Sequence, residues 1–133
     1  MKEFHLQIAT PDGIEFDGMA TSLLVRCESG DIEILCGHAD YFGSVGIGKA
    51  RIKTNDGVRI ASCAGGFLSV DKNGARLVTT TFEYAEEINV ERAKAAKKAA
   101  EEILAKEKDE KAILRAEAKL ARSLNRIKVA ELI

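Results

Sequence analysis

The sequence has few aromatic residues, almost no proline and no tryptophan. Of its 133 residues, 5% are aromatic, one is proline and three are cysteine. A core must therefore be built from aliphatic side chains. An odd number of cysteines without a C-x-x-C pair argues against a disulfide framework and favours a reducing compartment. Long apolar runs are missing too, and no basic segment precedes an apolar one near the N-terminus, so we expect neither a membrane span nor a secretory signal.

An excess of charge of one sign is also missing. The chain carries 20 Lys and Arg residues against 21 Asp and Glu residues, which gives a net charge of -1. A charge-driven nucleic-acid binder has a basic excess, so we expect no nucleic-acid partner. Cys36 and His38 are close enough in sequence to share a metal, but a zinc site needs about four ligands and His5 is the only other histidine. We therefore predict no metal site.

Glycine is confined to the first part of the chain. All 11 glycines and the single proline lie between Pro11 and Gly74. There, short apolar runs alternate with turn sequences at intervals of about ten residues, which is typical of a β-sandwich or barrel. The strands predicted from these runs are residues 4–9, 22–27, 32–36, 50–53, 58–62, 67–70 and 77–79.

The chain beyond residue 88 is rich in Ala, Lys and Glu, which are strong helix formers. Asn89 is a candidate N-cap, and a charged break at residues 106–111 separates two predicted helices. The predicted apolar faces are Ala93, Ala96, Ala100 and Ile103 on the first helix, and Ile113, Ala116, Leu120, Leu124 and Ile127 on the second. An alanine seam buries little area, so we expect a weakly held hairpin.

The predicted fold class is α+β. We expect an N-terminal β-sandwich of about ten short strands over residues 1–84. An antiparallel two-helix hairpin is expected over residues 85–133.

The segment from Gly43 to Ala50 nearly matches the phosphate-binding loop G-x-x-x-x-G-K-[ST]. Ala50 stands where a hydroxyl should reach Mg²⁺, and the segment leads into a hairpin turn instead of opening a helix. We interpret it as a glycine-rich β connection. No nucleophile elbow or marked carboxylate pair is present, so we predict no catalytic residue.

A basic stripe runs along the second predicted helix. Arg115, Lys119, Arg122 and Arg126 share one face because they are spaced by three or four residues. Arg115 lies about 200° around the axis from Ile113, so we expect the basic stripe nearly opposite the apolar one. The spacing alone fits an ordinary solvated face or an anion-seeking surface for an acidic segment or phosphates.

Several spaced motifs resemble the epsilon subunit of bacterial F-type ATP synthase. They are TPDG at residues 10–13, GDIEILCGHA at 30–39, GGFLSV at 65–70, and EYAEEI at 83–88 followed by Arg92-Ala93. The resemblance covers nearly the whole chain. It departs from the usual family pattern at Glu33, where Gly is frequent, and at Cys36, where Pro is usual.

The resemblance implies a non-catalytic central-stalk subunit of a proton- or sodium-translocating complex. The subunit would be peripheral, at the cytoplasmic face of the bacterial cell membrane. Its sandwich would lie between the gamma subunit and the c-ring and couple the catalytic head to that ring. The implied rotor contacts are Asp31, Glu33, His38 and Ala39.

The resemblance also implies that the hairpin moves. When extended, it would reach the alpha and beta subunits and block ATP hydrolysis. The implied contacts with an acidic segment of the beta subunit are Arg115, Arg122 and Arg126.

Some relatives bind ATP on the folded hairpin as a regulatory ligand, and no other cofactor is implied. The matching positions here are Glu83, Ile88, Asn89, Arg92, Ala93, Arg122 and Arg126. Asn89 replaces an aspartate of the motif and Ala99 replaces a usual arginine, so we expect weaker ATP binding than in relatives with the full motif. Two alternatives stay open: a small nucleotide-binding enzyme, and a free-standing interaction module unrelated to ATP synthase.

Overall fold

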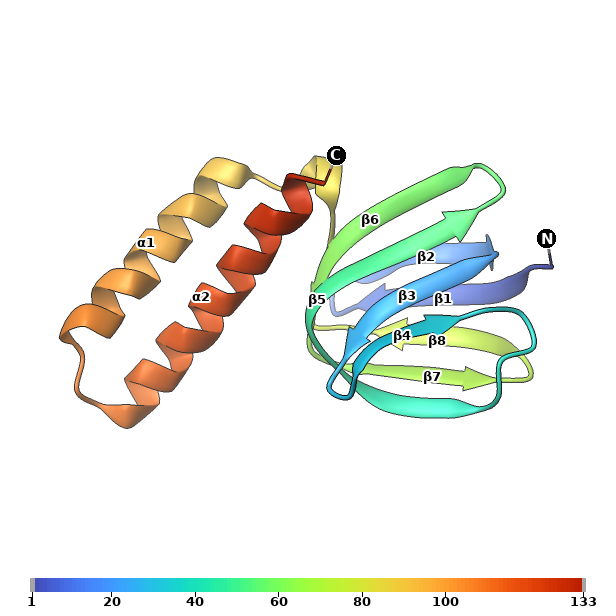
Figure 1. The fold of residues 1–133 in the computed structure, drawn as a ribbon, viewed down its shortest axis with the longest axis horizontal. Helices are drawn as coiled ribbons and strands as arrows, with labels where there is room; N and C mark the ends of the chain where they lie inside the picture. The colour runs from blue at the N-terminus through green and yellow to red at the C-terminus, as the bar shows by residue number, and fades with distance from the viewer. Residues whose placement is uncertain (1, 133) are drawn as a thin grey trace. The chain divides into compact units, whose positions relative to one another are not determined.

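The computed structural model describes residues 2–132, which fall into two compact units, one ending at Tyr84 and one beginning at Ala85 (Figure 1). The strands of the first unit are β1 Phe4–Thr10, β2 Gly13–Ala20, β3 Ser22–Cys27, β4 Gly30–Ile34, β5 Tyr41–Thr54, β6 Gly57–Ala64, β7 Phe67–Asp71, β8 Gly74–Val78 and β9 Thr81–Tyr84. The second unit contains the 3-10 helix η1 Ala85–Glu87 and the helices α1 Val90–Lys106 and α2 Glu110–Ala130. The predicted α+β class, a sandwich followed by a helical hairpin, is confirmed.

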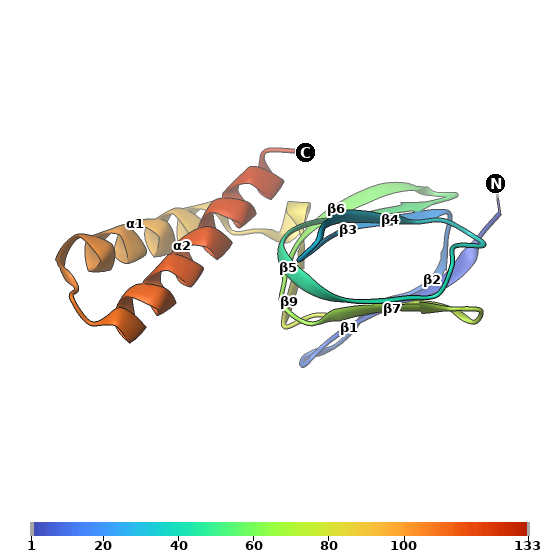
Figure 2. The ribbon, with the colours of Figure 1, turned by 60° about the horizontal axis from the view of Figure 1, so that its bottom comes forward.

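Strand β5 connects the two layers of the sandwich. Its first residues, Tyr41 to Ser44, pair with β7, and its later residues pair with β3 and β6. One layer therefore has the order β2-β1-β8-β7-β5, and the other has the order β4-β3-β5-β6-β9. Figure 2 shows the two layers facing each other across the core.

The space between the layers is filled mainly by aliphatic side chains. In β1, Leu6 and Ile8 are fully buried while His5 and Gln7 alternate with them on the other face. The same alternation buries Leu68 in β7 and other side chains of both layers. Each such side chain contributes roughly 1.5–3 kcal/mol on burial. The aliphatic core expected from the scarcity of aromatic residues is confirmed.

The glycine-rich segment is part of a strand and not a connection between strands. It lies inside β5, where a Cβ at Gly48 would collide with the side chain of Arg26 from β3. The glycine therefore makes room for an arginine that crosses the strand. Because β5 continues through this segment, no helix N-terminus can face a phosphate there.

Both long helices begin at a side-chain cap. The Asn89 Oδ1 accepts a hydrogen bond from the Arg92 backbone N–H at 3.0 Å, which confirms the predicted N-cap. The Asp109 carboxylate accepts from the Ala112 N–H at 3.1 Å. Between the helices, one Glu107 oxygen accepts from the N–H groups of Lys108 and Asp109, each at 3.0 Å.

The line of contact between α1 and α2 is made of small residues. Ala93 and Ala100 are buried on α1, and Ala116 and Ser123 are buried on α2. The Ser123 hydroxyl donates to the Lys119 carbonyl at 2.8 Å, so its burial leaves no unpaired donor.

Two residues predicted for the apolar faces lie outside this line. Leu124 is 38% exposed and Ile103 is 41% exposed, so both predictions were wrong. Small side chains allow close helix approach, and Ser123 faces α1 about 100° around the axis from Leu124. Of the other predicted residues of the second helix, Ala116 is buried and Ile113, Leu120 and Ile127 are half-buried.

The basic stripe flanks the contact line and does not lie opposite to it. Arg115 and Arg122 each precede a buried residue of α2, Ala116 or Ser123, by one position, or about 100° around the axis. Arg115, Lys119 and Arg122 are exposed. The predicted placement was wrong because the buried face is centred on Ala116 and Ser123, not on the leucines.

Candidate functional site

The predicted nucleotide-binding residues are divided between the two units. Glu83 lies in β9, where it pairs with Ser62 of β6. The other six lie in the helical unit: Ile88, Asn89, Arg92, Ala93, Arg122 and Arg126. Because the helices are antiparallel, the first turn of α1 and the last turns of α2 lie at the same end of the hairpin (Figure 1).

The polar members at this end of the hairpin are mostly cationic. Arg92 and Arg122 are exposed, and Arg126 is half-buried. Arg122 and Arg126 are one turn apart, so they lie on one face of α2. Guanidinium groups suit phosphate oxygens through paired N–H donors. The arrangement can attract an anion, with Arg115 further along the same face.

The other predicted nucleotide contacts of the hairpin are either buried or already hydrogen-bonded within the fold. Ile88 and Ala93 are 8% and 0% exposed. The Asn89 oxygen is used by the helix cap, so its amide NH₂ is the group left for a ligand. A carboxylate at this position would offer a second acceptor oxygen, which Asn89 lacks.

The predicted rotor contacts do not form one cluster. In β4, Ile34 is buried, so Asp31 and Glu33 lie on the outer face of the strand. Asp31 Oδ1 forms an ion pair with Arg26 Nε at 3.1 Å. Glu33 Oε2 accepts from the Arg51 guanidinium at 2.6 Å.

His38 and Ala39 lie in the loop between β4 and β5. The His38 Nδ1–H donates to the Ala39 carbonyl at 2.6 Å. Since a carbonyl only accepts, this contact places the proton of the neutral ring on Nδ1 and leaves Nε2 as an acceptor. His38 therefore offers a hydrogen-bond acceptor near the end of the sandwich.

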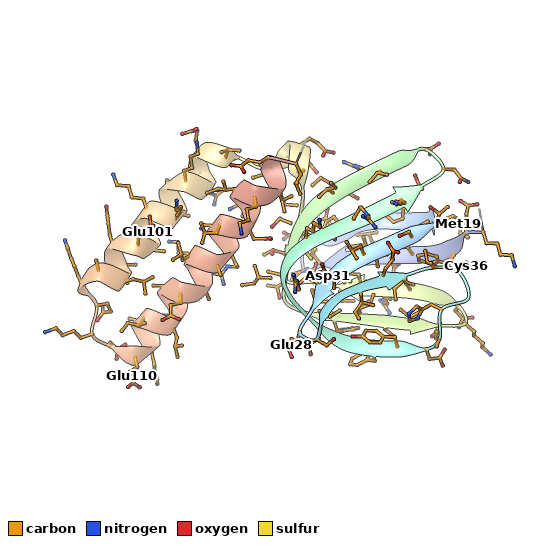
Figure 3. The ribbon with its side chains drawn as sticks, viewed as in Figure 1. Met19, Glu28, Asp31, Cys36, Glu101 and Glu110 are labelled. Atoms are coloured by element: carbon orange, nitrogen blue, oxygen red, sulfur yellow. The ribbon has the colours of Figure 1, made fainter. Side chains whose placement is uncertain are left out.

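A hollow of about 350 Å³ opens at this end of the sandwich, and the sequence did not reveal it. Figure 3 labels two of its lining residues, Met19 and Cys36. Its lining comes from four segments and comprises residues 3–5, Met19, residues 34–38 and residues 70–74. Because these segments are far apart in the sequence, no local pattern indicates that they form one hollow.

The three cysteines differ in accessibility. Cys27 and Cys63 are buried, and Cys36 is exposed at the hollow. Burial raises the pKa of the Cys63 thiol to about 12 and also raises the pKa of Cys27. Burial therefore disfavours the reactive thiolate form of Cys27 and Cys63.

Within residues 2–132, no group of three or more His, Cys, Asp or Glu side chains is arranged to hold a metal ion. Within the same described range, no helix is long and apolar enough to cross a membrane.

The two units correspond to two family domains that occur in the same order. The beta-sandwich domain of the ATP synthase delta/epsilon chain matches residues 3–85, and its long alpha-helix domain matches residues 86–131. This chain belongs to the ATP synthase delta/epsilon family.

Family members of known name match over nearly their whole length. The ATP synthase epsilon chain of Bacillus velezensis is 42% identical over 98% of this chain and 98% of its own. Those of Caldicellulosiruptor saccharolyticus and Staphylococcus aureus strain JH9 are 37% and 36% identical over at least 96% of both chains.

Solved structures share the fold at lower identity. A chain of the Euglena gracilis mitochondrial ATP synthase (OSCP/F1/c-ring) has a TM-score of 0.83 at 20% identity, over 98% of this chain and 82% of that one. A chain of the Tetrahymena thermophila mitochondrial ATP synthase (central stalk/c-ring) has a TM-score of 0.65 at 11% identity, over 97% of both.

Proposed function

We propose that the chain is the epsilon subunit of the central stalk of a bacterial F-type ATP synthase. It is a non-catalytic, peripheral subunit at the cytoplasmic face of the membrane and couples the catalytic head to an ion-translocating c-ring. The observation that carries this proposal is the match of both family domains, in order, over residues 3–131. Bacterial epsilon chains at 36–42% identity support it.

The sandwich is the part that contacts the rotor, namely the gamma subunit and the c-ring. The loop after β4 carries His38 and Ala39, and its exposed residues can meet a partner. Asp31 and Glu33 are also assigned to this contact, although each already has an arginine partner on the sandwich.

The hairpin is the part that inhibits ATP hydrolysis, by extending toward the alpha and beta subunits. Arg115 and Arg122 are exposed and Arg126 is half-buried on one flank of α2, so they can meet an acidic segment of the beta subunit. Replacing all three with Ala should relieve inhibition while the helix contact persists, because that contact is made by Ala116 and Ser123. Inhibition as strong as wild type would place the contact elsewhere.

ATP is a regulatory ligand of the folded hairpin. Arg92, Arg122 and Arg126 supply cationic groups from the end where α1 begins and α2 ends. Asn89 and Ala99 each remove a motif group, and losing a charged hydrogen bond typically costs about 1.5–3 kcal/mol. ATP should therefore bind more weakly than in relatives with the full motif. NMR shifts at the three arginines during ATP titration, abolished by Arg92→Ala, would support this site; no shift at several millimolar ATP would remove it.

Neither alternative retains support. A nucleotide-binding enzyme would need the Gly43 to Lys49 segment to open a helix, but that segment lies within β5. A module unrelated to ATP synthase is contradicted by the family match over both units.

Reconstitution tests the proposed function as a whole. The chain is added to a bacterial ATP synthase from which the epsilon subunit has been removed. It should bind the complex, restore ATP-driven ion pumping and lower ATP hydrolysis. A chain that does not bind the epsilon-depleted complex would contradict the proposal.

A further inference from the structure

We propose that Tyr84 is the fixed pivot of the hairpin, and that the hairpin turns about the single joint between Tyr84 and Ala85. This inference rests on the proposed function, because it specifies how the inhibitory movement of the hairpin is set. Tyr84 is then a positioning residue, which acts on ATP hydrolysis only through the hairpin. The joint coincides with the boundary between the two compact units.

A β-bulge in β2 provides the acceptor for the Tyr84 hydroxyl. The register of β1 against β2 shifts between Ile8 and Ala9, and it passes over Glu15 of β2. The backbone of such an extra residue is left out of the ladder between the strands. The Tyr84 hydroxyl donates to the Glu15 carbonyl at 3.2 Å, so a side chain from β9 satisfies this bulge carbonyl.

This hydrogen bond links the two layers of the sandwich at their edges. Strand β2 is an edge strand of one layer and β9 is an edge strand of the other. Strand β9 has four residues, and among the described strands it pairs with β6 alone. The end of so short a strand frays readily unless side chains hold it. Tyr84 is its last residue and fixes the point from which the hairpin continues.

Two further side chains hold the Tyr84 ring. The Arg59 guanidinium carbon lies 3.4 Å from the ring centroid, which is a cation–π contact. Phe82, two residues earlier in β9, meets the ring edge-on with the centroids 5.1 Å apart. Tyr84 is 5% exposed, so both its ring and its hydroxyl are fixed within the sandwich.

The residues that follow Tyr84 are held in the helical unit instead. Ala85 and Ile88 are buried, and the Ile88 N–H donates to the Ala85 carbonyl at 3.3 Å. The 3-10 helix η1, which begins at Ala85, packs against α2. The chain is therefore fixed in the sandwich up to Tyr84 and in the hairpin from Ala85. Since peptide bonds are rigid, turning is limited to the backbone dihedral angles at this joint.

A short joint keeps the hairpin close to the site that it inhibits. Loss of the anchor would release residues 81–84 of β9. The free segment would grow from about one residue to about five, and effective concentration falls with roughly the −3/2 power of linker length, or about tenfold here. The ratio of inhibited to active complexes should fall by the same factor.

Variants of the two anchoring groups test this pivot. Tyr84→Phe removes the hydroxyl and keeps the ring, and Arg59→Gln removes the cation at an exposed position. Arg59→Lys keeps a cation and should behave more like wild type. The matched control is Lys53→Gln, because Lys53 lies in the same layer, opposite Val58 of β6.

The measurement uses complexes reconstituted from an epsilon-depleted ATP synthase. The hydrolysis rate is compared with that of a complex containing residues 1–85 alone, which gives the fully active rate. The double variant Tyr84→Phe, Arg59→Gln should lose hydrogen-exchange protection at residues 81–84, and its ratio of inhibited to active complexes should fall about tenfold. Lys53→Gln should change both readouts less than about twofold, and ATP-driven pumping should persist in all variants.

An insertion separates the pivot from a general weakening of the sandwich. Four glycines between Tyr84 and Ala85 lengthen the joint and leave every anchoring contact in place. This variant should show the same fall of about tenfold in inhibition, with unchanged protection at residues 81–84. It also decides the question if the double variant fails to fold.

Two results would overturn the pivot and leave the proposed function intact. One is unchanged protection of β9 in the folded double variant, because Tyr84 would then not anchor the strand. The other is unchanged inhibition after the glycine insertion, because the length of the joint would then not matter. A wild-type chain that binds the complex without lowering hydrolysis would reject the inhibitory hairpin and the pivot together.

Discussion

The sandwich and the hairpin are stabilised by side chains of very different size. The sandwich buries leucine, isoleucine and valine between two layers, whereas the helices meet through Ala93, Ala100, Ala116 and Ser123. Burial contributes about 0.8 kcal/mol per CH₂ group, so a contact made by alanines contributes much less stabilisation than a core of leucines. The contact between the two helices should therefore be weaker than the packing of the sandwich core.

Hydrogen bonding reinforces this contrast. Each strand of the sandwich depends on its neighbours for backbone partners, so strands cannot part without leaving backbone groups unpaired. Each helix satisfies its backbone internally and is capped by its own residues, Asn89 or Asp109. The hairpin can therefore open without breaking backbone hydrogen bonds within its helices.

The largest effect is expected in the sandwich core. Leu77 is fully buried in β8, between β1 and β7. Leu77→Ala should lower the free energy of unfolding by about 2–5 kcal/mol, through lost burial and a residual cavity. Urea unfolding followed by circular dichroism measures this. The control Val58→Ala, at an exposed site, should stay within about 0.5 kcal/mol of wild type. Similar losses for both variants would show that the sandwich is not held by this core.

A smaller and local effect is expected in the hairpin. Ser123 is 3% exposed in the line of contact between the helices. Ser123→Leu overpacks that line and should cost about 1–3 kcal/mol by pushing the helices apart. Hydrogen exchange should show reduced protection in α1 and α2 and unchanged protection in the strands.

The neighbouring residue provides the control for this variant. Leu124→Ala removes a partly exposed side chain outside the seam, so protection of the helices should change little. If Ser123→Leu loosened the strands as strongly as the helices, the two units would not be energetically separate.

The smallest effect concerns the turn between the helices. Hydrogen bonds from the backbone N–H groups of Asp109 and Lys108 lower the pKa of the Glu107 carboxyl below its ordinary value of 4.5. Because the folded pKa is the lower one, this stabilisation is present above pH 4.5 and is lost as the pH falls through the folded pKa.

The amide NMR shifts of Lys108 and Asp109 should therefore move together on acidification below pH 4.5. Glu107→Gln keeps the acceptor oxygen and removes the titration, so it serves as the control. Persistence of the same titration in Glu107→Gln would assign it to another group.

The sequence predicted the fold class because its two patterns are strong and local. Alternating apolar residues identified strands such as β1, and the Asn89 cap identified the start of α1. The first half of β5 was missed because its glycines carry no side-chain pattern. The need for glycine at position 48 becomes clear only in the fold, because a side chain there would collide with Arg26 of β3.

The details of both candidate surfaces depend on residues brought together by folding. The hydrophobic spacing predicted Leu124 in the helix contact, whereas the structure buries the smaller Ser123 there. The hollow escaped prediction because its lining comes from four separated segments. The ATP-binding, inhibitory and rotor-contact residues stay predictions, since each depends on a nucleotide or a partner subunit.

In the proposed function, the sandwich couples the catalytic head to the c-ring and the hairpin inhibits ATP hydrolysis. Deleting residues 86–133 and reconstituting the truncated chain into an epsilon-depleted ATP synthase tests it most directly, since the sandwich core lies entirely before residue 85. ATP hydrolysis and ATP-driven ion pumping are measured on the same preparation, beside the full-length chain. We expect a folded truncated chain, retained pumping and raised hydrolysis. Hydrolysis equal to that of the full-length complex, or loss of pumping, would contradict it.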